Sequence, residues 1–320
     1  MAKVIVTGAS GFIGGQTAIQ LKSAGYQVVG IDLLPPTSEL SVVFDEFFQG
    51  NFASDVALRL VSNFNPVAII HCAGTSLVGP SVLNPEVYYQ NNFVRTKVLL
   101  DYIVANKLNI RVIFSSSASV YGEPIMTPCH EVDPSIPVSP YGESKHMVEM
   151  MLNSYHRAYG LDFVAFRYFN ACGADSQARH GQRAGATHII ARVLESIYVD
   201  SEFTLNGTDF PTEDGTCIRD YVHVEDIANA HALAVGATVP AGTYNLGNNI
   251  GTSNQQIIKV AEHVTGKTLK VKPGPQRAGD PAHLTASSKK FNEVAGNWKR
   301  FNLEDMIAHA WAWQQARSVK

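Results

Sequence analysis

The chain has 320 residues, of which 45% are hydrophobic and 17% are charged, and its formal net charge is −3. This composition is typical of a globular enzyme with a substantial core, in one large or two modest domains. Lysine and arginine form no basic stripe, so we expect no nucleic acid and no anionic membrane as a partner. No apolar run approaches the length of a membrane span.

Two further features indicate a cytoplasmic protein without a metal centre. An apolar run begins at once, at residues 2–6, and leaves no room for a signal peptide. The four cysteines have no metal-binding spacing such as CxxC, so we interpret them as reduced packing residues. The histidines at His71, His130, His188 and His223 are too scattered to form a metal cluster.

The first half of the chain alternates short apolar runs with helical segments. Buried parallel strands are expected at residues 4–6, 28–31, 67–70 and 112–114. Amphipathic segments lie between them, notably at residues 14–24 and 85–106. Strands that alternate with helices predict a doubly wound parallel sheet. One more strand is expected at residues 161–166, after the helix that carries Tyr141.

The pattern changes near residue 171, where glycine, arginine, aspartate and proline become frequent. We therefore predict one domain over residues 1–170 and a smaller mixed α/β lobe over 171–218 and 248–320. A helix-like segment at 222–234 and a strand-like one at 243–246 suggest that residues 219–247 rejoin the first domain. A last amphipathic helix is expected at residues 303–314.

A glycine loop follows the first expected strand and opens a helix. Gly8, Gly11 and Gly14 have the spacing GxxGxxG, with Phe12 and Ile13 between the last two. Such glycines permit a tight turn and let backbone N–H groups approach a pyrophosphate. The second strand ends in Asp32, which can bind both ribose hydroxyls and would repel a 2′-phosphate. We therefore predict a Rossmann-type sheet that binds NAD rather than NADP.

Tyr141 and Lys145 stand four residues apart, so one helical turn brings them to the same face. A phenol loses its proton near about pH 10, and an ammonium group one turn away should lower that pKa. The oxidation of an alcohol or carbohydrate needs such a base. The same spacing occurs by accident in many surface helices, so its meaning depends on the rest of the chain.

The other strand ends also carry small or polar residues. Residues 71–74 (His-Cys-Ala-Gly) would let a cofactor lie close to the backbone, because ligands bind at the carboxyl ends of such strands. Three serines, 115–117, follow the strand that ends at Phe114. They precede Tyr141 by one crossover, so Ser117 could share a substrate hydroxyl with Tyr141.

These motifs together resemble an extended short-chain dehydrogenase/reductase. Within that superfamily the chain resembles the UDP-glucose 4-epimerase (UDP-galactose 4-epimerase) family along nearly its whole length. The most specific matches are residues 81–85, 88–92, 115–122, 167–170, 207–224 and 277–282. The resemblance implies interconversion of UDP-glucose and UDP-galactose by transient oxidation at sugar C4, with NAD tightly bound and regenerated in each turnover. It also implies a homodimer packed through helices at 85–106 and 141–159.

The resemblance implies a role for each matching residue. The catalytic residues would be Ser117, Tyr141 and Lys145, with Lys145 also holding the nicotinamide ribose and lowering the Tyr141 pKa. The cofactor would contact Gly8, Gly11, Phe12, Ile13, Gly14, Asp32, Leu33, Asn51, Phe52, Cys72, Ala73, Gly74, Ser76, Asn92, Ser115, Tyr141, Lys145, Tyr168 and Phe169. The UDP-sugar substrate would contact Ser117, Tyr141, Asn170, His188, Ile189, Thr204, Asn206, Arg219, Arg277, Asp280 and Leu284. Arg219 and Arg277 would bind the diphosphate, which suits forked guanidinium donors.

Three positions depart from the family's usual pattern. Ser76 stands where several members have a lysine near the cofactor, and Arg95 stands where the family usually has glycine. Arg95 must point to solvent or reach a partner. Leu284 matches a gate residue beside the sugar, where bulk excludes N-acetyl sugars. Leucine is intermediate in size, and we expect a preference for UDP-glucose and UDP-galactose.

Other activities of the superfamily are less consistent with the residues. A 4,6-dehydratase would carry an Asp-Glu pair where this chain has Ala118 and Ser119. A UDP-glucuronate epimerase or decarboxylase would need cationic groups for the sugar carboxylate, and a small gate residue would admit the N-acetyl sugars of a UDP-N-acetylglucosamine epimerase. The sequence leaves both of these alternatives open. A silent NAD-binding sensor could lose its base, whereas this chain keeps Ser117, Tyr141 and Lys145.

Overall fold

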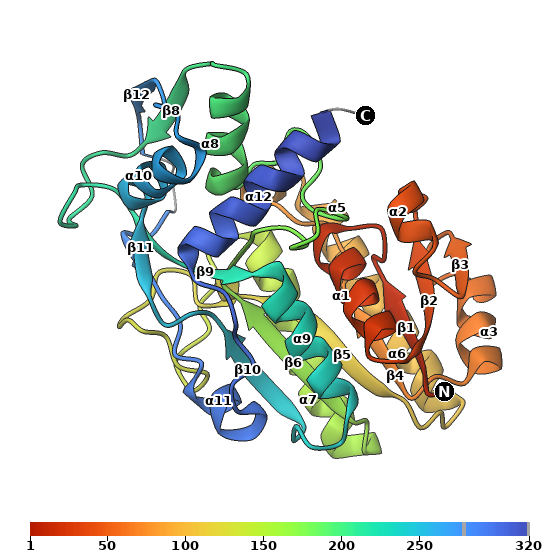
Figure 1. Cartoon of the computed structure of the whole chain (residues 1–320). Coiled ribbons are helices and arrows are strands. Elements are labelled where there is room, and N and C mark those ends of the chain that lie inside the picture. The colour runs from red at the N-terminus through yellow and green to blue at the C-terminus, as the bar shows by residue number, and fades with distance from the viewer. Residues whose placement is uncertain (277–279, 319–320) are drawn as a thin grey trace.

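The computed structural model describes residues 1–276 and 280–318, and its centre is a seven-stranded parallel sheet (Figure 1). The strand order is β10 (Gly242–Leu246), β6 (Phe163–Tyr168), β5 (Arg111–Ser117), β4 (Ala68–His71), β1 (Lys3–Thr7), β2 (Gln27–Asp32) and β3 (Glu46–Gln49). Every neighbouring pair is parallel. The predicted doubly wound parallel sheet is therefore confirmed.

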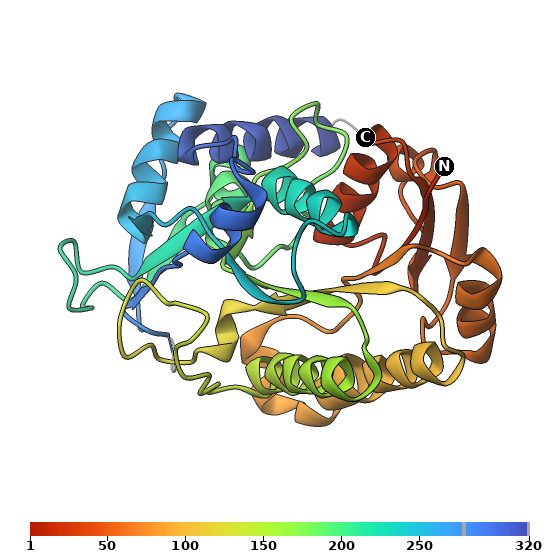
Figure 2. The same ribbon diagram turned by 90° about the horizontal axis from the view of Figure 1, so that it is seen from below.

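The strands are apolar on both sides because helices cover both faces. Val4 and Val6 pack into one core cluster and Ile5 into the other, as the two-residue period of a strand requires. α1 (Phe12–Ser23) and α9 (Val224–Val235) cover the first face. α3 (Asp55–Phe64), α6 (Arg95–Ala105) and α7 (Pro140–Tyr159) cover the second. Figure 2 shows these layers from below, with the sheet between them.

The sheet is completed by a segment that is distant in sequence. β10 pairs with β6, and α9 packs against α1. Residues 224–246 thus lie with the first half of the chain, after an excursion through the smaller lobe. The burial of the whole inner side of α9, including Ile227, Ala230 and Ala234, explains why this return is stable.

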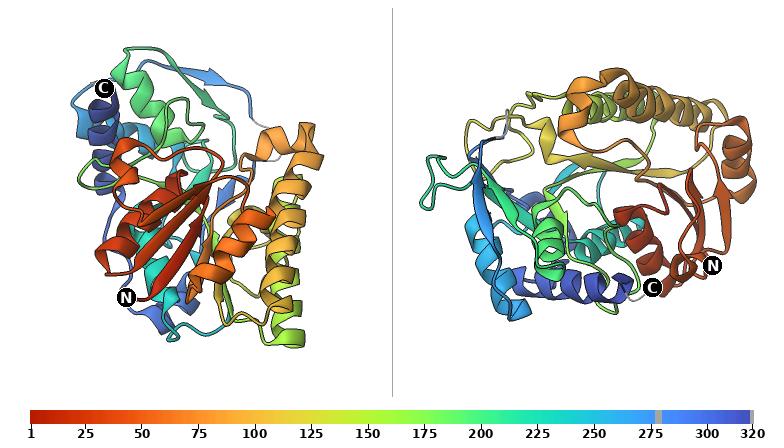
Figure 3. Two further views of the ribbon diagram at one scale, coloured as in Figure 1. Left: turned by 90° about the vertical axis from the view of Figure 1, so that its right-hand side faces the viewer. Right: turned by 90° about the horizontal axis from the view of Figure 1, so that it is seen from above.

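In the part of the chain that the structure describes, short sheets and helices form the smaller lobe, which Figure 3 shows from two further sides. β9 (Ile218–His223) pairs with β7 (Asn170–Cys172), β11 (Gly251–Ser253) and β13 (His283–Leu284), and β8 (Phe203–Asn206) pairs with β12 (Val271–Gly274). The core of this lobe contains Tyr221 and Cys172. It is enclosed by three helices, α8 (Ile189–Tyr198), α10 (Asn254–Thr265) and α12 (Leu303–Ser318).

The structure divides one segment that the sequence predicts as a single helix. Residues 85–105 form α5 (Pro85–Tyr88), a π-helical turn η1 (Tyr89–Val94) and then α6. Amphipathic periodicity does not distinguish one π turn from an α turn, and such turns are common at functional sites. The remaining short elements are α2 (Ser38–Ser41), α4 (Val78–Leu83), η2 (Ala118–Val120) and α11 (Lys289–Ala295).

Among the described residues, no helix combines the length and apolar character that a membrane crossing requires.

Candidate active site

The glycine loop between β1 and α1 leaves no room for side chains. Gly8 has a φ of +68°, and a Cβ atom there would lie 2.7 Å from the amide nitrogen of Ala73. A Cβ atom on Gly14 would lie 2.1 Å from the carbonyl oxygen of Gly8. No side chain caps the N-terminus of α1, where Gly11 is the cap residue. This bare cradle fits a pyrophosphate, which helix N-terminal N–H groups bind well.

Backbone hydrogen bonds orient the carboxylate of Asp32 at the carboxyl end of β2. Its two oxygens accept hydrogen bonds from the backbone N–H groups of Ser10 and Leu34, both at 3.0 Å. Leu33 beside it is exposed. The carboxylate is thus oriented without being neutralised by a side-chain cation, as binding to ribose hydroxyls requires.

The π-helical turn η1 brings Asn92 to the carboxyl end of β4. The side-chain oxygen of Asn92 accepts from the N–H of Thr75 at 2.7 Å, and its amide nitrogen donates to the Ser144 hydroxyl at 2.9 Å. Ser144 lies on α7 between Tyr141 and Lys145. Asn92 therefore joins the loop after β4, which contains Cys72, Ala73, Gly74 and Ser76, to the helix that carries the candidate base.

Ser117, Tyr141 and Lys145 meet at the carboxyl end of β5. Ser117 is the last residue of β5, and α7 begins one turn before Lys145, with the hydroxyl of Ser139 accepting from the N–H of Gly142 at 3.2 Å. Lys145 Nζ donates to the carbonyl oxygen of Ser115 at 2.8 Å and lies 5.9 Å from the centre of the Tyr141 ring. The structure thus unites residues separated by a crossover of more than twenty residues.

In this structure the pKa of Tyr141 lies above its ordinary value, whereas the nearby Lys145 was expected to lower it. Burial raises the pKa of Tyr141, and a hydrogen bond with Ser117 opposes that rise only in part. Burial also lowers the pKa of Lys145 to about 8, against the influence of Cys72 and Glu149. The Lys145 ammonium group lies over the face of the tyrosine ring and donates a hydrogen bond to the carbonyl oxygen of Ser115.

The other predicted cofactor residues have ordinary structural partners in the same region. The side chain of Asn51 accepts from the N–H of Ala53 at 3.0 Å, and the Phe52 ring lies 4.7 Å from that of His71. Cys72 is partly buried, and burial raises the pKa of its thiol to about 11.

The hydroxyl of Tyr168 lies 3.0 Å from that of Ser115 and also bonds to His231. The Phe169 ring packs 6.3 Å from the Tyr121 ring. Both aromatic side chains are buried. Tyr168 contacts Ser115 of the serine run, and Phe169 packs in the cluster that contains Ala118, directly after that run.

The smaller lobe contributes a cation beside the predicted sugar gate. Arg219 is nearly buried, and its Nη2 atom lies 3.4 Å from the Asp280 carboxylate. Leu284 on β13 is paired in register with Arg219 on β9, and it packs against a cluster that includes Ala118 and Phe169. Asn170 is half-buried on β7 and pairs with Tyr221 on β9. The predicted diphosphate contact Arg277 lies outside the described residues.

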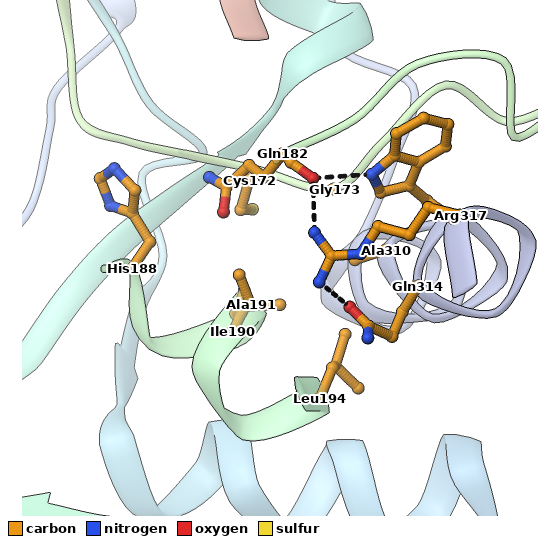
Figure 4. A pocket seen from close by; sticks show the side chains of 11 residues that line it. Cys172, Gly173, Gln182, His188, Ile190, Ala191, Leu194, Ala310, Gln314 and Arg317 are labelled. Carbon is orange, nitrogen blue, oxygen red and sulfur yellow. Dashed lines mark hydrogen bonds between the residues drawn. The ribbon is translucent and has the colours of Figure 1, made fainter. Parts of the chain in front are cut away.

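The predicted residues at the outer part of the lobe fall on two elements. Thr204 and Asn206 lie on β8, both half-buried, whereas His188 is the cap residue of α8 and Ile189 is its first residue. Figure 4 shows His188 at a small pocket of about 20 Å³ between α8 and α12. The backbone oxygen of Gln182 there accepts from Trp313 Nε1 at 2.7 Å and from Arg317 Nη1 at 3.0 Å.

One segment at the cofactor loop has no signal in the sequence. Residues 175–183, which we call the strap, cross over the start of α1. His180 Nε2 lies 2.9 Å from the carbonyl oxygen of Phe12, and Arg183 Nη2 donates to the carbonyl oxygen of Ser10 at 3.1 Å. The strap is irregular and forms no motif, so only its tertiary contacts reveal it. Among the described residues, no three His, Cys, Asp or Glu side chains are grouped to hold a metal ion.

The parallel sheet and the glycine loop together define a dinucleotide-binding protein with a Rossmann-type fold. The model of the NAD dependent epimerase/dehydratase family matches residues 4–247. The chain is 40% identical to UDP-glucose 4-epimerase of Halalkalibacterium halodurans, over 98% of this chain and 95% of that protein. It is 38% identical to UDP-glucose 4-epimerase of Lacticaseibacillus casei, over 98% of this chain and 96% of that one.

The comparison with solved structures leads to the same family as the comparison of sequences. A UDP-glucose 4-epimerase from Bifidobacterium longum, in complex with NAD⁺ and UDP, superposes with a TM-score of 0.93 at 32% identity, covering 99% of each chain. One from Brucella ovis, in complex with NAD, has a TM-score of 0.92 at 36% identity and covers 98% of each. The chain therefore belongs to the NAD dependent epimerase/dehydratase family. The predicted family, fold class and NAD dependence are confirmed.

Proposed function

We propose that this chain interconverts UDP-glucose and UDP-galactose by inverting the sugar at C4. The observation that carries the proposal is the meeting of Ser117, Tyr141 and Lys145 at the carboxyl end of β5. The Arg219–Asp280 pair of the smaller lobe adds a cation that suits a diphosphate. The relatives named UDP-glucose 4-epimerase align over nearly the whole chain, which supports the same substrate.

The chain's own residues would move one proton. Tyr141 would accept the proton of the sugar 4-hydroxyl and return it later, while the Ser117 hydroxyl binds the reacting oxygen. Lys145, held by the Ser115 carbonyl, would supply positive charge beside the phenol as it ionises. NAD, bound at the glycine loop and Asp32, would supply the redox chemistry at C4. Inversion needs a hexose that can turn while the nucleotide stays bound.

Two parts of the chain would divide these tasks. Residues 1–170 with 219–247 would bind NAD, and residues 171–218 with 248–320 would bind the nucleotide. Arg219 and Arg277 would bind the diphosphate, and Asp280 would bind the uridine ribose. Asn170, His188, Ile189, Thr204 and Asn206 would line the same half of the substrate site.

A second candidate substrate is UDP-N-acetylglucosamine. One solved relative, a UDP-Glc/GlcNAc 4-epimerase from Campylobacter jejuni, is 30% identical over 99% of this chain. Leu284 bears on this choice, since it packs beside Ala118 and Phe169 at the serine run. Because a leucine narrows the space for an N-acetyl group, we expect a lower kcat/KM for the N-acetyl sugars.

One experiment tests the proposal. The purified protein is incubated separately with UDP-galactose, UDP-N-acetylgalactosamine and UDP-galacturonate, and the products are separated by chromatography. We expect UDP-glucose from the first without consumption of free NAD. Stoichiometric NAD consumption would indicate a net oxidoreductase, and the absence of any product would refute the proposal.

We further propose a cytoplasmic homodimer. The four cysteines are free, as in a reducing compartment. The outer surface of α4, α5, η1, α6 and α7 exposes an apolar group that a second copy could cover: Val82, Leu83, Val87, Val94, Val98 and Met150. Arg95 lies half-buried beside Val94. Sedimentation of the Val98→Asp variant tests the dimer, and an unchanged dimer would count against this surface.

A further inference from the structure

A buried ion pair lies one helical turn beyond Lys145. Glu149 on α7 is 2% exposed and Arg167 on β6 is 5% exposed. Arg167 Nε donates to the Glu149 carboxylate at 3.0 Å, and Arg167 Nη2 donates to it at 2.7 Å. The proton transfer proposed above uses neither residue, so the pair requires its own explanation.

The carboxylate of Glu149 connects the two segments that carry the catalytic groups. It accepts a hydrogen bond from the Ser116 hydroxyl. Ser116 lies between Ser115, whose carbonyl holds Lys145, and Ser117, which faces the phenol. Glu149 itself lies on the same helix as Lys145. One carboxylate therefore fixes the end of β5 against the first turns of α7.

Arg167 connects the Glu149 carboxylate to β6 and to two loop residues, Tyr121 and Ser135. Ser116 and Arg167 are direct partners in the β5–β6 register. The guanidinium lies 4.7 Å from the centre of the Tyr121 ring and donates to the Ser135 hydroxyl at 3.1 Å. The hydroxyl of Tyr121 donates to the side chain of Asn245 on β10 at 2.7 Å. The pair is therefore held from four separate parts of the chain.

Stability alone is a weak reason for such a pair. The desolvation of two buried charges offsets most of their attraction, and apolar replacements are often neutral or stabilising. Within the described residues, Arg167 Nη1 is buried without a hydrogen-bond partner, so the pair is not fully satisfied. Hydrogen bonds and charge from His146, Arg167 and Ser116 outweigh burial and lower the pKa of Glu149, so its carboxylate stays ionised.

We propose that Glu149 is a positioning residue for catalysis: it sets the distance between Ser117 and the Tyr141–Lys145 turn, and its negative charge favours the ammonium form of Lys145. Arg167 orients that carboxylate. The inference rests on the proposed epimerase function. Among the described residues, the charged or titratable groups around Lys145 include His71 at the end of β4 and Cys72 directly after it, with Tyr141 and Glu149 on α7. Arg167 reaches Glu149 from β6.

The sign of the expected pH effect follows from these charges. A nearby carboxylate favours a protonated amine, so removing Glu149 lowers the pKa of Lys145. If activity depends on the ammonium form, it is present below that pKa and is lost as pH rises through it. The alkaline limb of kcat/KM should therefore move to lower pH in a variant that lacks the carboxylate.

The test compares the double variant Glu149→Met/Arg167→Met with the native enzyme. The double replacement avoids leaving one buried charge unpaired, which Glu149→Gln alone would do. We expect a Tm close to the native value, a KM for UDP-galactose within about twofold, and a kcat about 10- to 100-fold lower, because small misplacements of reacting groups are costly. The alkaline limb should shift downward in Glu149→Gln, which removes the carboxylate charge alone. Glu149→Asp should restore part of the rate.

A matched control removes an exposed ion pair that, like Glu149 and Arg167, consists of one carboxylate and one cation. Lys97 and Asp101 lie on α6 at 2.6 Å, and Lys97→Met/Asp101→Leu should leave both kcat and the pH profile unchanged. A stable double variant of Glu149 and Arg167 with native kcat and native pH profile would overturn the inference. Inactivity of the native enzyme on UDP-galactose would instead refute the proposed function, so the two failures are distinguishable.

Discussion

Tyr141→Phe is the most direct test of the proposed chemistry. The substitution removes one hydroxyl and keeps the aromatic ring. The ring would keep its edge contact with Tyr88, at 6.3 Å between ring centres, and its place 5.9 Å from Lys145 Nζ. Since no packing volume is lost, we expect the free energy of unfolding to change by less than about 1 kcal/mol.

The effect on rate should be far larger than the effect on stability. General acid–base catalysis contributes about 10²- to 10⁴-fold, which corresponds to roughly 2.7–5.4 kcal/mol at 1.36 kcal/mol per tenfold change. Ser117 can hydrogen-bond the reacting oxygen, but a serine hydroxyl is a poor base. The kcat should therefore fall by about this factor, while the KM for UDP-galactose, set by the distant diphosphate contacts, should change little.

The assay measures initial rates of UDP-glucose formation and the NAD content of the purified variant. Tyr159→Phe is a matched control, because Tyr159 is an exposed phenol at the far end of the same helix. It should behave as the native enzyme does. A Tyr141→Phe variant that folds, retains NAD and turns over within about tenfold of the native rate would refute the acid–base role.

Three further outcomes follow from the site. Because burial lowers the pKa of Lys145 to about 8, the kcat/KM of the free enzyme should fall as pH rises above about 8, and a profile that stays flat to pH 10 would contradict this. Asp32→Asn should weaken NAD binding in equilibrium dialysis by about 10- to 100-fold, since a charge-assisted hydrogen bond contributes about 1.5–3 kcal/mol, and should improve NADP relative to NAD. Arg183→Met should lower the NAD retained after gel filtration, whereas Arg157→Met, at an exposed helix end, should not.

Local motifs carried most of the successful predictions. The glycine loop, Asp32 and the four-residue spacing of Tyr141 and Lys145 depend on neighbours in the sequence, because turns and helical faces have short periods. The apolar runs of β1, β4 and β5 could be recognised for the same reason, since both faces of these strands are covered.

The short strands of the smaller lobe were not predictable in this way. β8, β11, β12 and β13 have two to four residues each, and several of their residues are exposed. Such segments have too few residues for a period to appear, and they are stable only because partner strands distant in sequence supply their hydrogen bonds. The strap over the glycine loop escaped prediction for the same reason.

The sequence by itself determined which groups are present: a glycine loop, a carboxylate at the end of the second strand, a phenol, an ammonium group and a serine, on a chain that alternates strands and helices. The tertiary structure decided how these groups behave. Burial raises the pKa of Tyr141, where a lowered pKa was expected, and it lowers the pKa of Lys145. It also joined Glu149 to Arg167 and Ser116. Desolvation and register depend on what packs from other parts of the chain, and no local pattern contains that information.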